Sequence, residues 1–408
     1  MRKHKKFYLE SLLPEEPYLS SLKQVKLVIS PEACGKKVHP LNFENPINTH
    51  LFKPTYYFDS DNTTICYCAT LTVAQHVRKA WEIYAQNFKP LKIRVKIQKE
   101  KNHKPPATQS LYSKYIQKLL KKAKIQENII IGKIDSLNAF LKMLFLKNEI
   151  EISQDKFKRL FIELEMHRLR HHLLTLHNFQ IFENYLDKKN LKKLESLFSP
   201  KIIWVGKYLG IENIKYKGKK ITILNLPWGQ DLAYAITKQL VARGKNIKKI
   251  FVVGGVGCVS DGVEIDDIFA ASSTQDENGN VITFENEFRK TFDKDGERYH
   301  SPSRMFAKKI VWGKLLCVNS SLGHEENFSQ KSKAKGISAF DMESYGIVKA
   351  IKENKSKAKI FMIHYIMDLP LKGLGLGATY YNKEFLTKLF SNFNRGKYFC
   401  FDHIFEHI

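Results

Sequence analysis

The stretch IKKIFVVGGVGCVSDGVEIDDIFAAS, residues 247–272, decides the expected fold. Residues 247–255 form a short apolar run that ends in glycines, and residues 266–272 form a second short run, so both are predicted to be buried strands. Apolar residues at helical spacing precede them at 231–244, and Gly244 ends that helix. Further runs with the composition of strands lie at 201–206, 219–226, 309–320 and 359–370. Strands that alternate with helices predict an α/β fold with a mostly parallel sheet covered on both faces.

The N-terminal half has a different pattern of apolar residues. Apolar residues recur every three or four positions, which predicts helices, in the stretches 71–88, 110–125, 136–148 and 155–186. Residues 1–60 hold many prolines and little periodicity, so irregular structure is expected there. We therefore predict a helix-rich, basic N-terminal α+β domain over 1–198 and a second domain over 199–408.

Composition limits the class of protein. No window is apolar enough to span a membrane, and the first residues lack the apolar core of a signal peptide, which predicts a cytoplasmic protein. The net charge of +26 comes mainly from scattered lysines, without an RNA-recognition signature or zinc-finger spacing. This argues against specific nucleic-acid binding and favours attraction of a small anion. His167 and His171 are four residues apart but lack the glutamate of a metalloprotease motif, so neither a metal nor a cofactor is expected.

Residues able to bind a ribosylated base follow several of the predicted strands. Gly229 follows 219–226, Gly254 and Gly255 end the run 247–255, and Glu343 and Asp368 follow two later apolar runs. Ligands of α/β sheets bind beyond the carboxyl ends of the strands. Glycines let the backbone approach a ligand closely, a carboxylate accepts hydrogen bonds from vicinal hydroxyls, and a carboxylic acid can give a proton to a heteroatom. A second acid, Asp341, is expected to cap the helix that begins nearby.

These motifs resemble the nucleoside phosphorylase and nucleosidase superfamily, over about 201–390. The matching segments occur in family order: YKGKKITILNLPWGQDLAYAITKQL, the glycine-rich segment 247–272, GISAFDMES and HYIMDLP. The family includes purine nucleoside phosphorylase, methylthioadenosine/adenosylhomocysteine nucleosidase and AMP nucleosidase. The resemblance implies a three-layer αβα fold, cleavage of the N-glycosidic bond of a purine nucleoside or nucleotide, and assembly into a homo-oligomer.

The resemblance also implies roles for individual residues. Glu343 matches the glutamate that holds the ribose 2′ and 3′ hydroxyls, and Met342 matches the methionine that packs against the sugar. Asp368 matches the aspartate that protonates the leaving purine. Gly254 and Gly255 match the backbone beside the anionic side of the ligand.

Departures from the family pattern bear on the reaction. Phosphorylases place an arginine just before the glycine-rich strand end to bind inorganic phosphate, but this chain has Phe251, Val252 and Val253 there. This favours hydrolysis, with phosphorolysis as the alternative and a non-catalytic nucleotide-binding module as a third reading. Glu212 is a candidate base for the attacking water. Its spacing departs from the family, and the first family strand can instead lie upstream, at 128–136.

Two further segments carry candidate substrate contacts. Arg298, Tyr299 and Arg304 lie in a loop, 284–306, where the family supplies aromatic stacking, and arginines also suit a substrate phosphate. The glycine-rich segment 371–381 follows Asp368 and is expected to act as a lid, with Lys372 placed to reach a substrate phosphate. The extra N-terminal domain and the basic charge are most similar to the arrangement of AMP nucleosidase, so a phosphorylated substrate is an option.

Overall fold

The architecture is taken from a computed structural model of the chain. It describes residues 24–29, 55–58, 63–68, 77–82, 94–99, 123–132, 180–197, 203–205, 209–226, 229–244, 246–291, 299–300, 307–320, 326–373 and 394–408, together with a few single positions between 75 and 163. Among these residues, no helix is long and apolar enough to cross a membrane.

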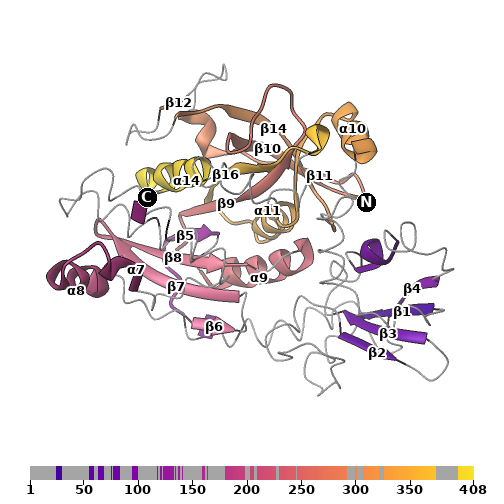
Figure 1. Cartoon of the computed structure of the whole chain (residues 1–408), viewed down its shortest axis with the longest axis horizontal. Coiled ribbons are helices and arrows are strands. Elements are labelled where there is room, and N and C mark those ends of the chain that lie inside the picture. The colour runs from indigo at the N-terminus through magenta and orange to yellow at the C-terminus, as the bar shows by residue number, and fades with distance from the viewer. Residues whose placement is uncertain are drawn as a thin grey trace.

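A ten-stranded mixed sheet forms the centre of the molecule (Figure 1). Its strands are β5 (Asn128–Ile131), β6 (Ile203–Val205), β7 (Leu209–Tyr216), β8 (Lys219–Asn225), β9 (Lys249–Cys258), β10 (Ile268–Asp276), β11 (Val281–Thr283), β14 (Ile310–Cys317), β15 (Ile337–Asp341) and β16 (Lys359–Asp368). They run in the order β11-β10-β14-β15-β9-β5-β8-β7-β6, and β16 pairs with both β9 and β10. The α/β class and the mixed sheet are thus as predicted.

The pairing of β16 closes part of the sheet on itself. β16 is parallel to β9 and antiparallel to β10, while β10, β14, β15 and β9 pair in succession. These five strands therefore form a closed ring. β11 pairs with β10, and β5, β8, β7 and β6 extend from β9 as an open sheet. Closure gives β9 and β16 partners on both sides and holds their carboxyl ends together.

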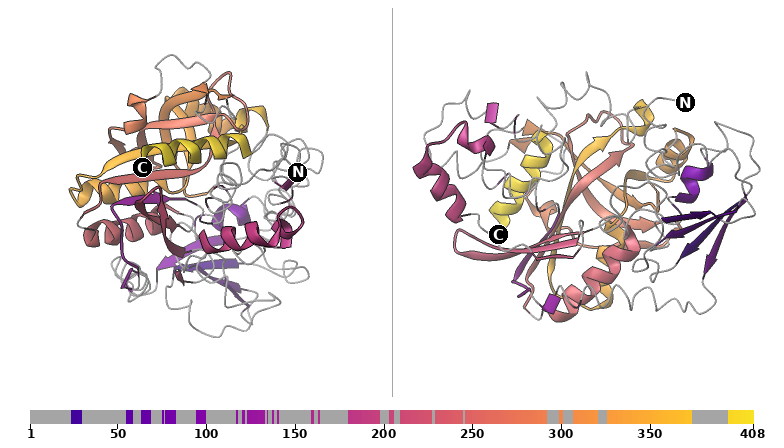
Figure 2. Two further views of the ribbon diagram at one scale, coloured as in Figure 1. Left: turned by 90° about the vertical axis from the view of Figure 1, so that its left-hand side faces the viewer. Right: turned by 60° about the horizontal axis from the view of Figure 1, so that its bottom comes forward.

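Helices cover the two faces of the sheet with separate apolar clusters. On one face α9 (Gln230–Arg243) and α11 (Ser344–Glu353) pack on the strands, with Ile236, Leu240 and Val348 fully or almost fully buried. On the other face lies α14 (Asn394–His407), which buries Phe399 and Ile404. The right-hand view of Figure 2 shows α14 in yellow and α9 in pink on opposite sides of the strands. The layers are therefore helix, sheet and helix.

The sheet extends across the expected domain boundary. β5 lies between β8 and β9 and is parallel to both, although it precedes residue 199. The upstream position 128–136, considered for the first family strand, is where this strand lies. The boundary between residues 198 and 199 is therefore not a limit of the sheet.

The described N-terminal residues include a second, four-stranded sheet. Its strands are β1 (Gln24–Ile29), β2 (Thr55–Phe58), β3 (Thr63–Cys68) and β4 (Arg94–Lys99), in the order β2-β3-β1-β4. The expectation of irregular structure over 1–60 is thus wrong for β1 and β2, because short strands between prolines leave too little periodicity to detect. Residues 77–82 are helical within the predicted 71–88, but most of the other predicted helices lie outside the described residues.

Five shorter helices and one small ribbon complete the described structure. They are α7 (Gln180–Glu183), α8 (Lys188–Leu197), α10 (Glu326–Ala334), the 3-10 helices η3 (Glu287–Lys290) and η5 (Pro370–Lys372), and the ribbon of β12 (Tyr299–His300) and β13 (Ala307–Lys308).

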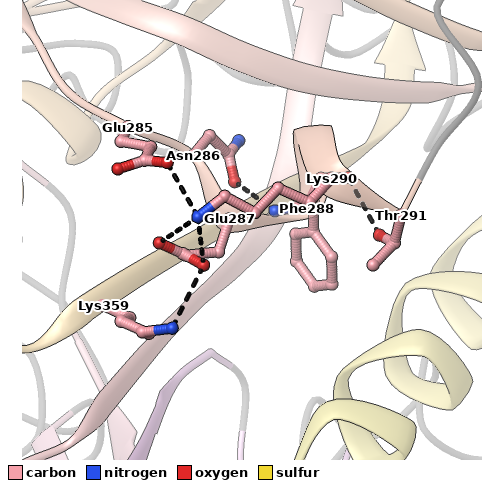
Figure 3. A network of polar contacts seen from close by, with 7 residues as sticks. All are labelled: Glu285, Asn286, Glu287, Phe288, Lys290, Thr291 and Lys359. Carbon is pink, nitrogen blue, oxygen red and sulfur yellow. Dashed lines mark hydrogen bonds and ion pairs between the residues drawn. The ribbon is translucent and has the colours of Figure 1, made fainter.

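Asn286 ties the start of the 284–306 segment to the ring. Its amide nitrogen donates to the carbonyls of Ala271 and Met362, at 2.9 and 2.7 Å, and its amide oxygen accepts from the Met362 backbone at 3.1 Å. The amide group of Asn286 is buried, and these three hydrogen bonds take the place of those that it would form with water in the unfolded chain. Figure 3 shows Lys290 and Lys359 sharing the carboxylate of Glu287 beside it. The segment is thus fixed to β10 and β16 at this point.

Close packing of α9 on α11 depends on Gly346. A methyl group there would collide with the backbone carbonyl of Gln230, at the first turn of α9. We expect Gly346→Ala to lower the free energy of unfolding by about 1–3 kcal/mol, because the two backbones must separate. Urea denaturation measures this change. Lys352→Ala, on the exposed face of α11, is the control, and equal stability of the two variants would contradict the close packing.

Candidate functional site

The carboxyl ends of β15 and β16 lie on either side of β9. Phe340 of β15 and Asp368 of β16 are both register partners of Gly257. Neighbouring strands are about 4.8 Å apart, so the Asp368 backbone and the segment that leads to Glu343 lie about 10 Å from each other across Gly257. The segment that leads to Glu343 and the end of β16 at Asp368 thus meet beside Gly257, near the carboxyl end of the central strand β9.

Glu343 links the carboxyl end of β15 to the start of α9 through a hydrogen bond. The backbone nitrogen of Gly229 donates to Oε1 of Glu343 at 3.3 Å. Gly229 has φ 108°, in the region that favours glycine, and precedes the first residue of α9. Glu343 is half-buried and immediately precedes α11. The hydrogen bond therefore links residues 114 positions apart and brings the starts of two helices together at the same place.

Met342 lies beside Glu343 and is also half-buried. It packs against an apolar cluster that includes Val259, Leu316 and Phe340. Contact with a sugar remains a prediction for this side chain.

Asp341 caps α11, as predicted. Its Oδ2 accepts a hydrogen bond from the Ser344 backbone nitrogen at 2.8 Å, and the side chain is buried. Burial raises the pKa of Asp341 to about 6, although the hydrogen bonds from Ser344 act in the opposite direction. Burial also raises the pKa of the neighbouring Cys317 thiol well above its ordinary value. The two acids of the motif thus differ: one caps the helix, and the other faces Gly229.

The raised pKa predicts a pH dependence of stability. The folded protein holds the Asp341 proton more tightly than the unfolded chain, so this stabilisation is present below pH 3.8 and is lost as pH rises through about 6. We expect Asp341→Asn, which can still cap the helix, to gain up to about 3 kcal/mol of unfolding free energy relative to wild type between pH 3.5 and pH 7. Urea denaturation across this range measures the difference. A constant difference would show that folding does not shift the pKa of Asp341.

Gly254 and Gly255 have different surroundings. A methyl group on Gly255 would collide with Sδ of Met367, so a side chain here would displace that of Met367. A methyl group on Gly254 would lie 3.7 Å from Nδ1 of His364 and, among the described residues beyond its chain neighbours, within 4 Å of nothing else. Gly254 is also partly exposed, although β9 is a central strand. Of the two glycines, only Gly254 could accept a methyl group without a close contact among the described residues.

Asp368 ends β16 and is almost fully buried, with 1% of its surface exposed. The register of β16 on β9 shifts between Ile366 and Asp368, which inserts one extra residue before the aspartate. Such bulges re-aim the side chains that follow them and are common beside active sites. The position of Asp368 thus depends on this irregularity.

Glu212 does not lie near the carboxyl ends of β9 and β16. It is fully buried within β7, where it pairs with Ile223 of β8. β8, β5 and β9 separate β7 from β16, so these two strands lie about 19 Å apart across the sheet. The register also places Glu212 level with Phe361, well before Asp368 along β16. Its role as a base stays a prediction, and we leave it out of the proposed site.

The remaining predicted contacts are described in part. Arg298 and Arg304 lie outside the described residues, and Tyr299 is placed only as a backbone position of β12. Lys372 is exposed, and its Nζ donates to the carbonyl of Val263 at 2.8 Å, so it lies against the segment that follows β9. Among the described residues, no group of three or more His, Cys, Asp or Glu side chains is placed to hold a metal.

His364 is a buried polar residue beside Gly254 that the sequence analysis did not single out. It lies in β16, four residues before Asp368, and is the register partner of Gly254. Only 2% of its surface is exposed. The available signal was a single polar residue inside the apolar run KIFMIHYIMD.

Comparison with known proteins gives structural neighbours only. No family model matches the chain, and no curated protein does. The chain is similar to the 5′-methylthioadenosine/S-adenosylhomocysteine nucleosidase of Neisseria meningitidis in complex with methylthio-immucillin-A, with 11% identity and a TM-score of 0.41 over 54% of this chain and 96% of that one. For the corresponding nucleosidase of Colwellia psychrerythraea 34H in complex with adenine, the values are 14% and 0.42, over 69% and 96%. For futalosine hydrolase of Helicobacter pylori strain 26695 they are 10% and 0.42, over 69% and 97%. These values are low, so the function has to be inferred from the residues of the chain itself.

Proposed function

We propose that this protein is a hydrolase that cleaves the N-glycosidic bond of a purine nucleoside or nucleotide. The observation that carries the proposal is the hydrogen bond between Gly229 and Glu343. It joins two of the sequence motifs that resemble nucleosidases, and a third motif, at Asp368, lies beside the same strand end. Motifs far apart in sequence are expected to converge in this way if they build one site.

The two carboxyl groups suit the chemistry of this reaction. Breaking an N-glycosidic bond leaves positive charge on the ribosyl group and negative charge on the departing base. In the proposed site the Glu343 carboxylate binds the ribose hydroxyls and complements the positive sugar. Asp368 gives its proton to the base nitrogen as the bond breaks, and water supplies the hydroxyl group that the sugar gains. The proton that this water loses returns through solvent to the Asp368 carboxylate, so one water is consumed for each base released.

Hydrolysis is favoured over phosphorolysis by the surroundings of β9. Phe251, Val252 and Val253 all lie within the two apolar clusters and are at most 6% exposed. This part of β9 therefore has no cationic side chain to hold inorganic phosphate. Water is the remaining nucleophile in this proposal.

The test is release of free base, followed by chromatography. The panel consists of AMP, adenosine, inosine and methylthioadenosine, each with and without inorganic phosphate. The proposal expects release of base and free ribose, or ribose phosphate from AMP, without added phosphate. Release only with phosphate would identify a phosphorylase. No release from any compound, with binding retained, would identify a nucleotide-binding module.

A further inference from the structure

The hairpin that joins β7 to β8 carries four lysines in six residues, KYKGKK at 215–220. We refer to these six residues as the lysine hairpin. All four lysine side chains are exposed, and none forms a hydrogen bond or an ion pair with another described residue. The end of the hairpin is therefore a concentration of positive charge without a direct counter-charge among the residues that the structure describes.

Two of these lysines face each other across the hairpin. Lys215 of β7 and Lys220 of β8 are register partners on antiparallel strands, so their side chains lie on the same face of the sheet. Like charges in this arrangement destabilise a sheet, whereas a lysine opposite a glutamate would stabilise it. Protection of the exposed edge of β7 would explain a lysine at 215, but not a second one opposite it.

The turn itself also holds a lysine at an unfavourable position. Lys217 has φ 45° and Gly218 has φ 78°, and they connect Tyr216 and Lys219, which pair at the ends of the two strands. A two-residue turn with both φ values positive favours Asn-Gly, because asparagine adopts this conformation at lower cost than lysine. Stability therefore explains the glycine of this turn but not the lysine before it.

The positive surface continues along the amino ends of the neighbouring strands. Lys249 of β9 and Lys359 of β16 are register partners on parallel strands. Burial lowers the pKa of Lys249, and repulsion from Lys219 and Lys359 lowers it further, so these three ammonium groups share one region. Lys249 also donates a hydrogen bond to the His407 carbonyl, at the end of α14.

The carboxylates nearby do not neutralise the hairpin. Glu127 lowers its charge only from a distance, because it forms its ion pair with Lys248, at 2.6 Å. Glu406 lies within electrostatic range of Lys217, but burial and the charge of Asp402 raise the pKa of Glu406 to about 7. This carboxyl group is therefore only partly ionised at neutral pH, and the hairpin keeps most of its positive charge.

This positive charge lies at the opposite end of β8 from the candidate site. Lys219 begins β8 and Asn225 ends it, which is about 20 Å along the strand, and Gly229 of the candidate site follows the far end. Lysines at this distance do not contact a nucleoside that is bound between Glu343 and Asp368. The lysine hairpin therefore requires a different anionic partner.

We propose that the lysine hairpin binds the sugar-phosphate backbone of a nucleic acid without reading its sequence. Closely spaced phosphates match a row of cations that extends over neighbouring strands, and their binding would offset the repulsion among the lysines. A lipid surface fits less well: among the described residues the exposed large hydrophobic side chain is Val281, in β11 at the other end of the sheet. This inference is independent of the proposed function.

The first test is binding of a fluorescein-labelled 20-nucleotide oligo(U) RNA to the full-length protein, followed by fluorescence anisotropy from 50 to 200 mM salt. Wild type is compared with the double variant Lys219→Gln/Lys220→Gln. We expect affinity at 50 mM salt to fall about 10–50-fold, and the slope of log K against log salt to decrease by about 1.4, because two phosphate contacts are lost. The matched control is Lys331→Gln/Lys335→Gln, which removes the same charge from exposed positions at α10. Equal losses in the two double variants would overturn the inference.

The second test uses Lys217→Asn, which places the favoured residue in the turn. We expect a melting temperature equal to or above that of wild type, together with about three- to tenfold weaker RNA binding at 50 mM salt. Opposite effects on stability and on binding would show that the lysine serves the partner and not the fold. RNA binding equal to that of wild type would contradict the assignment of Lys217.

The remaining outcomes separate this proposal from others. No binding of RNA by wild type at 50 mM salt would overturn it. Binding to vesicles of phosphatidylcholine and phosphatidylserine that needs Lys219 and Lys220, without binding of RNA, would assign the surface to a membrane instead. Release of adenine from adenosine is expected to be the same in Lys219→Gln/Lys220→Gln and wild type. Since RNA binding is measured without turnover, failure of the proposed function would leave this inference intact.

Discussion

Asp368→Asn is expected to lower kcat for adenine release by about 10²–10⁴-fold, the usual contribution of a general acid. Asparagine has nearly the same size as aspartate, so the end of β16 keeps its packing, but the amide has no acidic proton to give to the departing base. Chromatography of adenine released from adenosine at saturating concentration measures the effect. A riboside whose leaving group needs no proton, such as p-nitrophenyl β-D-ribofuranoside, should be affected much less.

The second substrate separates an acid from a merely structural residue. If the substitution distorted the site, both substrates would lose activity to the same extent. Asp261→Asn is the control for removing a carboxylate elsewhere, because Asp261 is exposed and its ion pair with Lys333 is at the surface. Wild-type adenine release by Asp368→Asn would remove Asp368 from the proposed mechanism.

Most of the main sheet could be predicted from local patterns. The segment 247–272 shows both of its strands, β9 and β10, because buried strands of an α/β sheet are apolar throughout and end in turn residues. The helix at 231–244 is nearly the observed α9, and Gly244 ends it. These elements are specified by residues close together in the chain.

The parts that depend on distant contacts could not be predicted with the same certainty. β5 contributes only four residues, NIII, and is separated from β6 by more than seventy positions. The sequence therefore indicates a strand near 128–136 but not its position between β8 and β9. The closed ring depends on the pairing of β16 with both β9 and β10. Such non-local pairing is decided by the packing of the whole domain.

In the candidate site, too, the features set by local sequence could be predicted, and those set by distant contacts could not. The Asp341 cap follows from the residue type and its position before a helix, and the structure confirms it. The bulge before Asp368 shifts the register by one residue, and nothing in HYIMDLP indicates it. His364 lies inside the apolar run of β16, so the sequence does not indicate its place beside Gly254.

Glu343→Gln gives the second large expected effect. The amide oxygen of glutamine can still accept the hydrogen bond from Gly229, so the starts of α9 and α11 are expected to stay together. The charged acceptor for the ribose hydroxyls is lost. Hydrogen bonds to a charged group contribute about 1.5–3 kcal/mol each, so the loss of two predicts a fall in kcat/KM for adenosine of about 10²–10⁴-fold.

A double-mutant comparison between protein and substrate tests the assignment of this contact. If Glu343 holds the 2′ hydroxyl, wild type will prefer a ligand with that hydroxyl, and Glu343→Gln will lose most of the preference. Dissociation constants of non-cleaved analogues of adenosine and 2′-deoxyadenosine measure this without interference from the weaker glycosidic bond of deoxynucleosides. Glu353→Gln, on the exposed end of α11, is the matched control. An unchanged preference in Glu343→Gln would show that this carboxylate organises the two helices and does not bind the sugar.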